Sequence, residues 1–175
     1  MLRHIHTQAQ ASMIRNFTFG VEDSLASTVG LLSGVASANV ANSTVILTGV
    51  ILVFTEAMSM GVGSFLSEQS VQEYEHGRDL PLKRTLPSAS IMFFSYLVAG
   101  VIPIAPYAFF DTPFSLYVSI AAAVISLMVL GFLNAHLSHT SVSRAVWRMG
   151  LLGGSVAVAG VIVGRLLKNF SGYAM

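Results

Sequence analysis

Long apolar runs, separated by short polar stretches, dominate the chain. Apolar residues cover all sides of each run instead of alternating with polar ones, which indicates helices rather than barrel strands. Five runs approach the length of about 20 residues that a membrane-spanning helix needs. They lie at about 16–38, 44–67, 87–110, 114–133 and 149–167. The pattern therefore predicts an all-α polytopic membrane protein in which residues 1–175 form one transmembrane domain of five helices, without a soluble domain.

Composition supports a membrane protein. Of the 175 residues, 54% are hydrophobic and 10% are charged, whereas soluble domains carry about 25% charged residues. The net charge of +1 gives no basic field of the kind that binds nucleic acid, so we expect no nucleic-acid partner. Cysteine is absent, which excludes disulfides and thiolate metal sites. The first 15 residues are polar and lack the apolar centre of a cleavable signal peptide.

The basic residues predict how the five helices are oriented. With the N-terminus inside, the outer segments hold only Arg165 and Lys168. The inner segments hold the other seven, which are Arg3, Arg15, Arg78, Lys83, Arg84, Arg144 and Arg148. This excess satisfies the positive-inside rule and predicts an N-in, C-out topology. We expect the cell membrane as host in a prokaryote, or a vacuolar or other organelle membrane in a eukaryote.

Three acidic residues lie within the first two apolar runs. Glu22 and Asp23 are adjacent in the first run, and Glu56 interrupts the second. An ionisable group in the bilayer costs on the order of 3 kcal/mol, so such residues usually have a function. Glu22 lies two helical turns from Arg15, so an ion pair with that arginine is the alternative for this residue. No basic residue shares the face of Asp23, and none lies in the run that contains Glu56.

The face of the first helix that carries Asp23 is small and polar. Steps of three and four residues place a set of side chains on this face, namely Asn16, Gly20, Asp23, Ser27, Gly30 and Gly34. Because small residues let helices approach closely in lipid, we expect the protein to form a homodimer through its first two helices. The small pairs of the last helix, Gly150 with Gly154 and Gly160 with Gly164, are assigned to packing within a protomer.

Asp23 and Met60 are expected to lie at the same depth in the membrane. Asp23 lies eight residues past Arg15, and Met60 lies eight residues before Glu68. Both are therefore roughly 12 Å inside the membrane at 1.5 Å per residue, with Glu56 one turn deeper. A carboxylate combined with a thioether favours late divalent metals over Mg²⁺ and Ca²⁺. The alternative for Met60 is packing, the usual role of methionine in a helix bundle.

Two motifs resemble those of the vacuolar iron transporter family. They are GVEDSLASTVGLLSGVA in the first run and EAMSMGVGSFLSEQS in the second, and the segment GFLNAHLSHTSVSRAVWRMGLLGGSVAVAGVIVGRLL is similar to the family's last one. The resemblance implies a five-helix protomer in a two-fold dimer that exports Fe²⁺, often Mn²⁺ too, from the cytosol in exchange for protons. It implies a transporter rather than an enzyme, without a permanently bound cofactor, in which Asp23 and Met60 line the ion path.

The chain departs from the family pattern at three places. Ser24 replaces a glycine, and Ser64 replaces an acidic residue while Glu56 adds one two turns earlier. The third departure is the segment after the second run, where the family's plant and protist iron members carry a glutamate-rich cytosolic metal-binding domain. Here a short acidic stripe remains, formed by Glu68, Glu75, His76 and Asp79 if the second helix continues to Pro81. It is either a weaker metal-binding surface or a solvated linker, and the linker is favoured.

The remaining chemistry is limited. His136 and His139 are three residues apart, but without a nearby acid an interfacial role is favoured over metal binding. The mechanism that we expect is exchange: Asp23 and Glu56 bind protons when the metal leaves and release them when it returns. One alternative is a facilitative channel without proton coupling. Another is a non-transporting membrane dimer that acts as a sensor or assembly factor.

Overall fold

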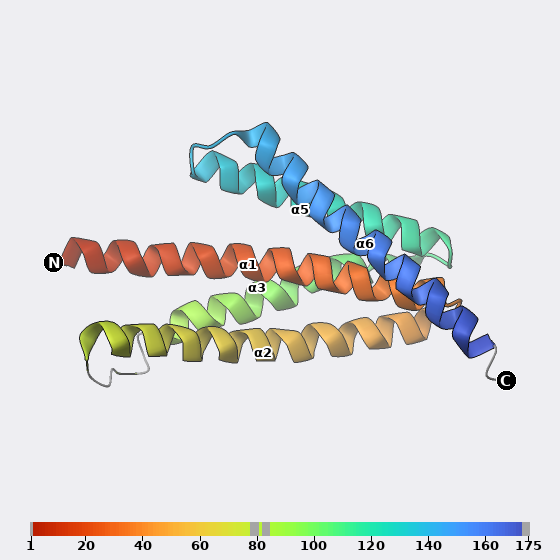
Figure 1. Cartoon of the computed structure of the whole chain (residues 1–175), viewed down its shortest axis with the longest axis horizontal. Helices are drawn as coiled ribbons and strands as arrows, with labels where there is room; N and C mark the ends of the chain where they lie inside the picture. The colour runs from red at the N-terminus through yellow and green to blue at the C-terminus, as the bar shows by residue number, and fades with distance from the viewer. Residues whose placement is uncertain (1, 78–80, 82–84, 173–175) are drawn as a thin grey trace.

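The structure is a computed structural model that describes the backbone of residues 2–77, 81 and 85–172, and the side chains of residues 11–75, 77, 81 and 85–170. Over these ranges all regular elements are helices, which confirms the all-α prediction. They are α1 (Leu2–Ser37), α2 (Asn42–His76), α3 (Leu86–Ile104), α4 (Pro106–Phe109), α5 (Phe114–Leu137) and α6 (Val142–Gly172). The long helices run back and forth along one axis, and the two termini lie at opposite ends (Figure 1).

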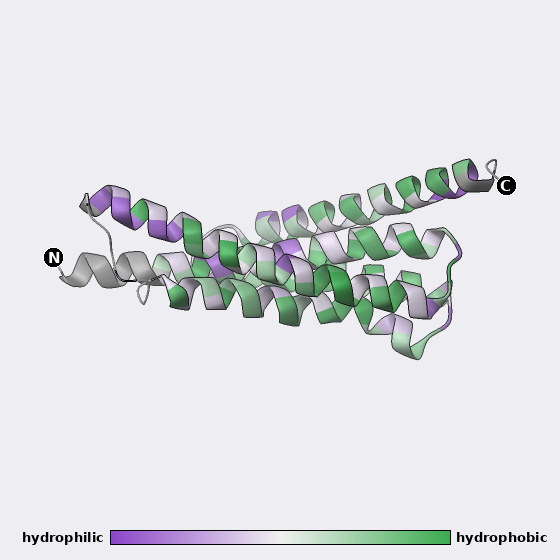
Figure 2. Ribbon diagram, turned by 90° about the horizontal axis from the view of Figure 1, so that it is seen from below, coloured by the Kyte–Doolittle hydropathy of each residue, from purple (hydrophilic) through white to green (hydrophobic). Residues whose placement is uncertain are grey.

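Four stretches of helix in the described residues are long and apolar enough to cross a membrane. They are Asn42–Glu75 in α2, Leu86–Phe109 across α3 and α4, Phe114–Leu137 in α5 and Val142–Phe170 in α6. Hydrophobic residues fill the middle of the bundle's length, and hydrophilic ones gather at the end where α2 stops (Figure 2). α1 is not among the four, because Glu22, Asp23 and many small polar residues lower its hydropathy.

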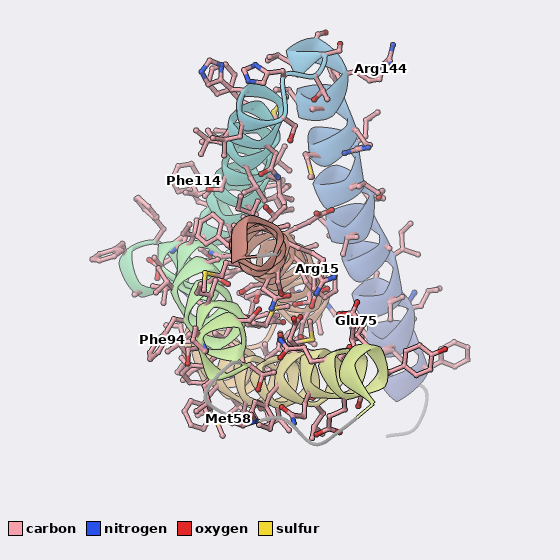
Figure 3. The ribbon with its side chains drawn as sticks, turned by 90° about the vertical axis from the view of Figure 1, so that its left-hand side faces the viewer. Arg15, Met58, Glu75, Phe94, Phe114 and Arg144 are labelled. Carbon is pink, nitrogen blue, oxygen red and sulfur yellow. The ribbon has the colours of Figure 1, made fainter. Side chains whose placement is uncertain are left out.

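The position of α1 explains how a helix of this composition is accommodated. It lies in the middle of the bundle and packs against α2, α3, α5 and α6, as the end-on view shows (Figure 3). Its buried side chains include hydroxyls as well as leucines, for example Ser24, Thr28 and Ser33 beside Leu25 and Leu32. A helix surrounded by protein needs less hydrophobicity than one that faces lipid on most sides.

The glycines of α1 pack within the protomer. The α-carbon of Gly34 faces Gly160 of α6, and a Cβ on Gly160 would lie 2.0 Å from the carbonyl oxygen of Gly30. A Cβ on Gly164 would lie 2.0 Å from that of Gly34. A Cβ on Gly20 would lie 2.2 Å from the Ser95 hydroxyl of α3. The expectation that this glycine face forms the dimer interface is therefore wrong, because α6 and α3 already occupy it, whereas the intramolecular role of Gly160 and Gly164 is confirmed.

The ends of the helices follow local backbone rules. α2 continues past the second apolar run to His76, where Gly77 stops it, so the helix does not extend to Pro81 as the full acidic stripe requires. Gly77 adopts φ 62°, which favours glycine, and its N–H donates to the carbonyl oxygen of Glu73 at 2.8 Å. Pro106 begins α4 directly after α3, so the third apolar run is built from two helices.

Candidate metal site

A polar seam joins α1, α2 and α3 toward the end where α2 stops. Asn16, 4% exposed, donates its side-chain amide to the Ser64 hydroxyl at 2.7 Å and to the Ser88 hydroxyl at 2.6 Å. Ser12 donates to the Glu68 carboxylate at 2.8 Å and lies 2.9 Å from the Ser88 hydroxyl. Each α1 residue thus contacts both neighbouring helices. In apolar surroundings such bonds hold the three helices in one register.

These short side chains fix the register between α1 and α2. Ser12 is opposite Glu68 and Asn16 is opposite Ser64, four residues further along each antiparallel helix. Continuing the same register places Asp23 opposite Ala57, so Glu56 lies near the level of Asp23. Met60 lies three residues nearer the seam, or about 4.5 Å.

This register differs from the depth count made on the sequence, which placed Asp23 level with Met60. That count took Arg15 and Glu68 as equally deep. The two do pair, with Arg15 Nη2 3.3 Å from Glu68 Oε2. However, the long arginine side chain reaches along the helix to make this contact, so the pair does not mark one level.

Two of the acids, Asp23 and Glu56, belong to a cluster of four polar residues that we call the acid cluster. Its other members are Ser27 and Tyr96. The Tyr96 hydroxyl of α3 donates to the carboxylate of Glu56 and lies 2.7 Å from the Ser27 hydroxyl of α1. Asp23 is close enough to both Glu56 and Tyr96 to interact with them electrostatically. Tyr96 is fully buried, while Asp23, Ser27 and Glu56 are half-buried. Three helices therefore bring two carboxylates and two hydroxyls together inside the bundle.

Tyr96 is the residue that sequence reasoning missed. The signal was available, since a buried tyrosine hydroxyl nearly always requires a hydrogen-bond partner and Tyr96 lies inside the third apolar run. Its backbone also takes part, because the Ser24 hydroxyl donates to the carbonyl oxygen of Tyr96 at 2.6 Å. Tyr96 therefore positions Glu56 and anchors α1 at the level of the acids.

Met60 and Glu22 lie beside this cluster. Met60 is half-buried and packs against the apolar core that contains Ala57 and Tyr96. Glu22 is half-buried on α1 next to Asp23. The partner of Arg15 is Glu68 rather than Glu22, so the ion pair considered for Glu22 does not form.

The acidic residues of the stripe on α2 differ in their contacts: Glu68 is hydrogen-bonded to other side chains, whereas Glu75 is exposed. The Glu68 carboxylate, 18% exposed, accepts hydrogen bonds from Ser12, Arg15 and Gln72. Glu75 is exposed on the last turn of the helix, on the side near Arg15 in the end-on view (Figure 3). His76 ends α2, but its side chain lies outside the described residues, as does the whole of Asp79.

The histidines of the α5–α6 turn lie apart from the acids. His136 and His139 are exposed, and the ring of His136 stacks on Phe132 with centroids 6.2 Å apart. In the described part of the chain no three His, Asp or Glu side chains gather closely enough to hold a metal ion. One protomer therefore offers a cation two carboxylates, two hydroxyls and the thioether of Met60, not a closed shell.

Comparison with known proteins places this arrangement in a family. The sequence matches the VIT family over residues 14–79 and 74–165. The chain belongs to the VIT family. These segments include all four residues of the acid cluster, and the match confirms the resemblance seen in the sequence.

Several named relatives align over most of the chain. Vacuolar iron transporter homolog 2 of Arabidopsis thaliana is 30% identical over 86% of this chain and 81% of its own length. Vacuolar iron transporter homolog 5 of Oryza sativa subsp. japonica is 28% identical over 91% and 83%. Vacuolar iron transporter 1 of Tulipa gesneriana is 20% identical over 90% and 88%. Membership of a transporter family and four apolar helices identify an integral membrane protein that is not an enzyme.

The length of one alignment distinguishes two kinds of relative. The alignment with the tulip protein spans 219 positions, more than the 175 residues of this chain, so the tulip protein has residues without counterparts here. The alignment with Arabidopsis homolog 2 spans only 162. Over the aligned region this VIT chain therefore leaves fewer residues of Arabidopsis homolog 2 unmatched than of the tulip transporter.

Proposed function

We propose that this VIT protein exports a divalent transition metal from the cytosol, Fe²⁺ first and Mn²⁺ as a second substrate, in exchange for protons. The observation that carries the proposal is the pair of half-buried carboxylates, Asp23 and Glu56, which interact electrostatically within an apolar bundle and of which Glu56 accepts a hydrogen bond from Tyr96. Two like charges in a low-dielectric environment repel each other, and a divalent cation or bound protons relieve that repulsion. The names of the relatives, vacuolar iron transporters and their homologs, supply the choice of metal.

Exchange follows from competition for the same oxygen atoms. A metal ion that reaches Asp23 and Glu56 displaces their protons, and its departure lets protons return. Met60 supplies a soft thioether about one helical turn along α2 from Glu56. This ligand favours Fe²⁺ or Mn²⁺ over the harder Mg²⁺ and Ca²⁺. Glu22 extends the negative charge toward the surface of α1. On the α2 side we expect Glu68 and Glu75 to lie along the approach, with His76 and Asp79 close to them in the sequence.

The proposed topology has five crossings with the N-terminus inside. α1 would cross the bilayer as the central helix, shielded from lipid by its neighbours. The N- and C-termini lie at opposite ends of the bundle (Figure 1), which supports an odd number of membrane crossings. We propose an organelle membrane of the vacuolar type as host, on the basis of the relatives' names.

A homodimer would complete the metal site, because a two-fold axis doubles each ligand. With the glycines of α1 occupied, the remaining candidate surface is the side of α2 next to Glu56. There Ser59, Gly63 and Ser67 are exposed, and a Cβ on Gly63 would meet nothing within 4 Å.

Cysteine cross-linking tests this interface in the cysteine-free chain. Gly63→Cys should give a disulfide-linked dimer in membranes, whereas Gly61→Cys should not, since Gly61 faces Phe93 of α3. Gly154→Cys on α6, also open within 4 Å, is the second control. A dimer formed by Gly154→Cys but not by Gly63→Cys would move the interface to α6.

The decisive experiment is metal uptake into sealed vesicles containing the purified protein. Fe²⁺ uptake that accelerates when the vesicle lumen is more acidic than the outside, and that alkalinises the lumen in step with metal entry, supports exchange. Uptake that ignores the pH gradient would identify a facilitative channel. Binding without any uptake, in vesicles with verified protein insertion, would identify a sensor or assembly factor.

A further inference from the structure

One face of α6 carries a basic and aromatic group at its beginning. Arg144, Trp147 and Arg148 follow steps of three and four residues, so they share one side of the first two turns. All three are exposed, and Trp147 is 63% exposed. Arg144 projects from the tip of the α5–α6 hairpin, away from the other helices (Figure 3). Neither arginine forms an ion pair or a hydrogen bond with a residue of the described ranges.

The same face continues as an apolar strip. Leu151, Val158 and Ile162 are 66%, 59% and 53% exposed, and they follow Arg148 along the helix. From Arg148 to Arg165 the helix rises about 26 Å at 1.5 Å per residue, close to the hydrocarbon thickness of about 30 Å. Arg144, Trp147 and Arg148 therefore lie at one edge of the hydrocarbon layer, and the strip lies within it.

We propose that Arg144, Trp147 and Arg148 form a binding surface for the phosphate headgroup of an anionic phospholipid, with its acyl chains lying along Leu151, Val158 and Ile162. An arginine guanidinium binds phosphate through two parallel hydrogen bonds. Tryptophan favours the headgroup level, where its ring is in apolar surroundings and its N–H reaches polar atoms.

Charge complementarity selects an anionic lipid. Two unpaired guanidinium groups one turn apart repel each other, and a headgroup of net negative charge reduces that repulsion. A zwitterionic phosphocholine brings its own positive charge and neutralises less. At about 1 kcal/mol for each basic residue near the surface, with 1.4 kcal/mol for each factor of ten, the two arginines favour an anionic over a zwitterionic lipid by roughly thirtyfold at most.

The chain provides its own reporter for this surface, because Trp147 is its single tryptophan. The full-length protein is placed in phosphatidylcholine vesicles that contain a minority of phosphatidylglycerol, and bromine, which quenches tryptophan, is carried by one lipid at a time. For equal mole fractions, brominated phosphatidylglycerol should quench Trp147 several-fold more than brominated phosphatidylcholine.

Matched variants separate this surface from general membrane charge. The double variant Arg144→Gln and Arg148→Gln should lose the preference, while Arg165→Gln and Lys168→Gln at the other end of α6 should keep it. Raising the ionic strength to about 1 M, where the Debye length is about 3 Å, should weaken the wild-type preference without any mutation. Equal quenching by both lipids in the wild-type protein, or a preference unchanged in the first double variant or by salt, would overturn the proposal.

Discussion

The two sides of α1 are built from similar residues but do different work. Toward α6, Gly30 and Gly34 meet Gly160 and Gly164 so closely that backbone contacts backbone. Toward α2 and α3, small polar residues meet Ser64, Ser88 and Tyr96 through side-chain hydrogen bonds. The first contact leaves no room for any ligand and sets the helix crossing. The second keeps two carboxylates half-buried, which is where ion chemistry can occur.

The largest effect is expected when one acid is removed from the side of α1 that faces α2 and α3. Asp23→Asn keeps the shape of the side chain and removes its charge, so we expect metal uptake into vesicles to fall by about tenfold or more, which corresponds to 1.4 kcal/mol of lost metal binding. Asp111→Asn is the matched control, because Asp111 is exposed in the loop before α5. Undiminished uptake by Asp23→Asn would remove this residue from the ion path.

The glycine side should respond through stability. Gly160→Ala adds a single methyl group against the Gly30 carbonyl oxygen, and overpacking of this kind typically costs 1–3 kcal/mol, so we expect about that loss. Gly154→Ala adds the same methyl group where nothing lies within 4 Å, and it should leave the melting temperature unchanged or raise it, because alanine favours helix. Thermal unfolding in detergent compares the two. Equal melting temperatures would mean that the α1–α6 contact is looser than described.

The fold was largely predictable because long apolar runs leave few alternatives to helices. The packing partner of the α1 glycines could not be predicted from the sequence. Spacing of four residues indicates a close helix approach but does not identify the partner, and Gly160 with Gly164 has the same spacing as Gly30 with Gly34. A second copy and α6 therefore fit the sequence equally well, and only the three-dimensional packing selects α6.

The candidate site was predictable in its acids and not in its arrangement. Asp23 and Glu56 were identifiable because charge in an apolar run is costly. Their relation to Met60 depended on the register of α1 and α2, which the long side chain of Arg15 obscured. Tyr96 joins the cluster from a third helix, 40 residues from Glu56. No spacing rule links residues that far apart, so its role required the structure.

Tyr96 allows a finer test of the polar side. Tyr96→Phe keeps the ring and removes the hydroxyl that bonds Glu56 and Ser27, so we expect the fold to persist and the uptake rate to fall several-fold. Hydrogen bonds to charged groups contribute about 1.5–3 kcal/mol, which sets the upper limit of the effect. Tyr117→Phe, at a tyrosine that is 65% exposed, is the control. An unchanged uptake rate would limit Tyr96 to packing.

The smallest effect is expected at the end of the polar side, on the last turns of α2. Glu75 is exposed and Glu73 accepts its hydrogen bond from Gln69 of the same helix, so neither connects α2 to α1 as Glu68 does. The double variant Glu73→Gln and Glu75→Gln should leave the metal concentration for half-maximal uptake nearly unchanged. Glu68→Gln should lower stability by no more than about 1 kcal/mol, since its partner Arg15 is 70% exposed and exposed ion pairs contribute little. A several-fold rise in the half-maximal concentration for the double variant would show that Glu73 or Glu75 captures metal before it reaches Asp23 and Glu56.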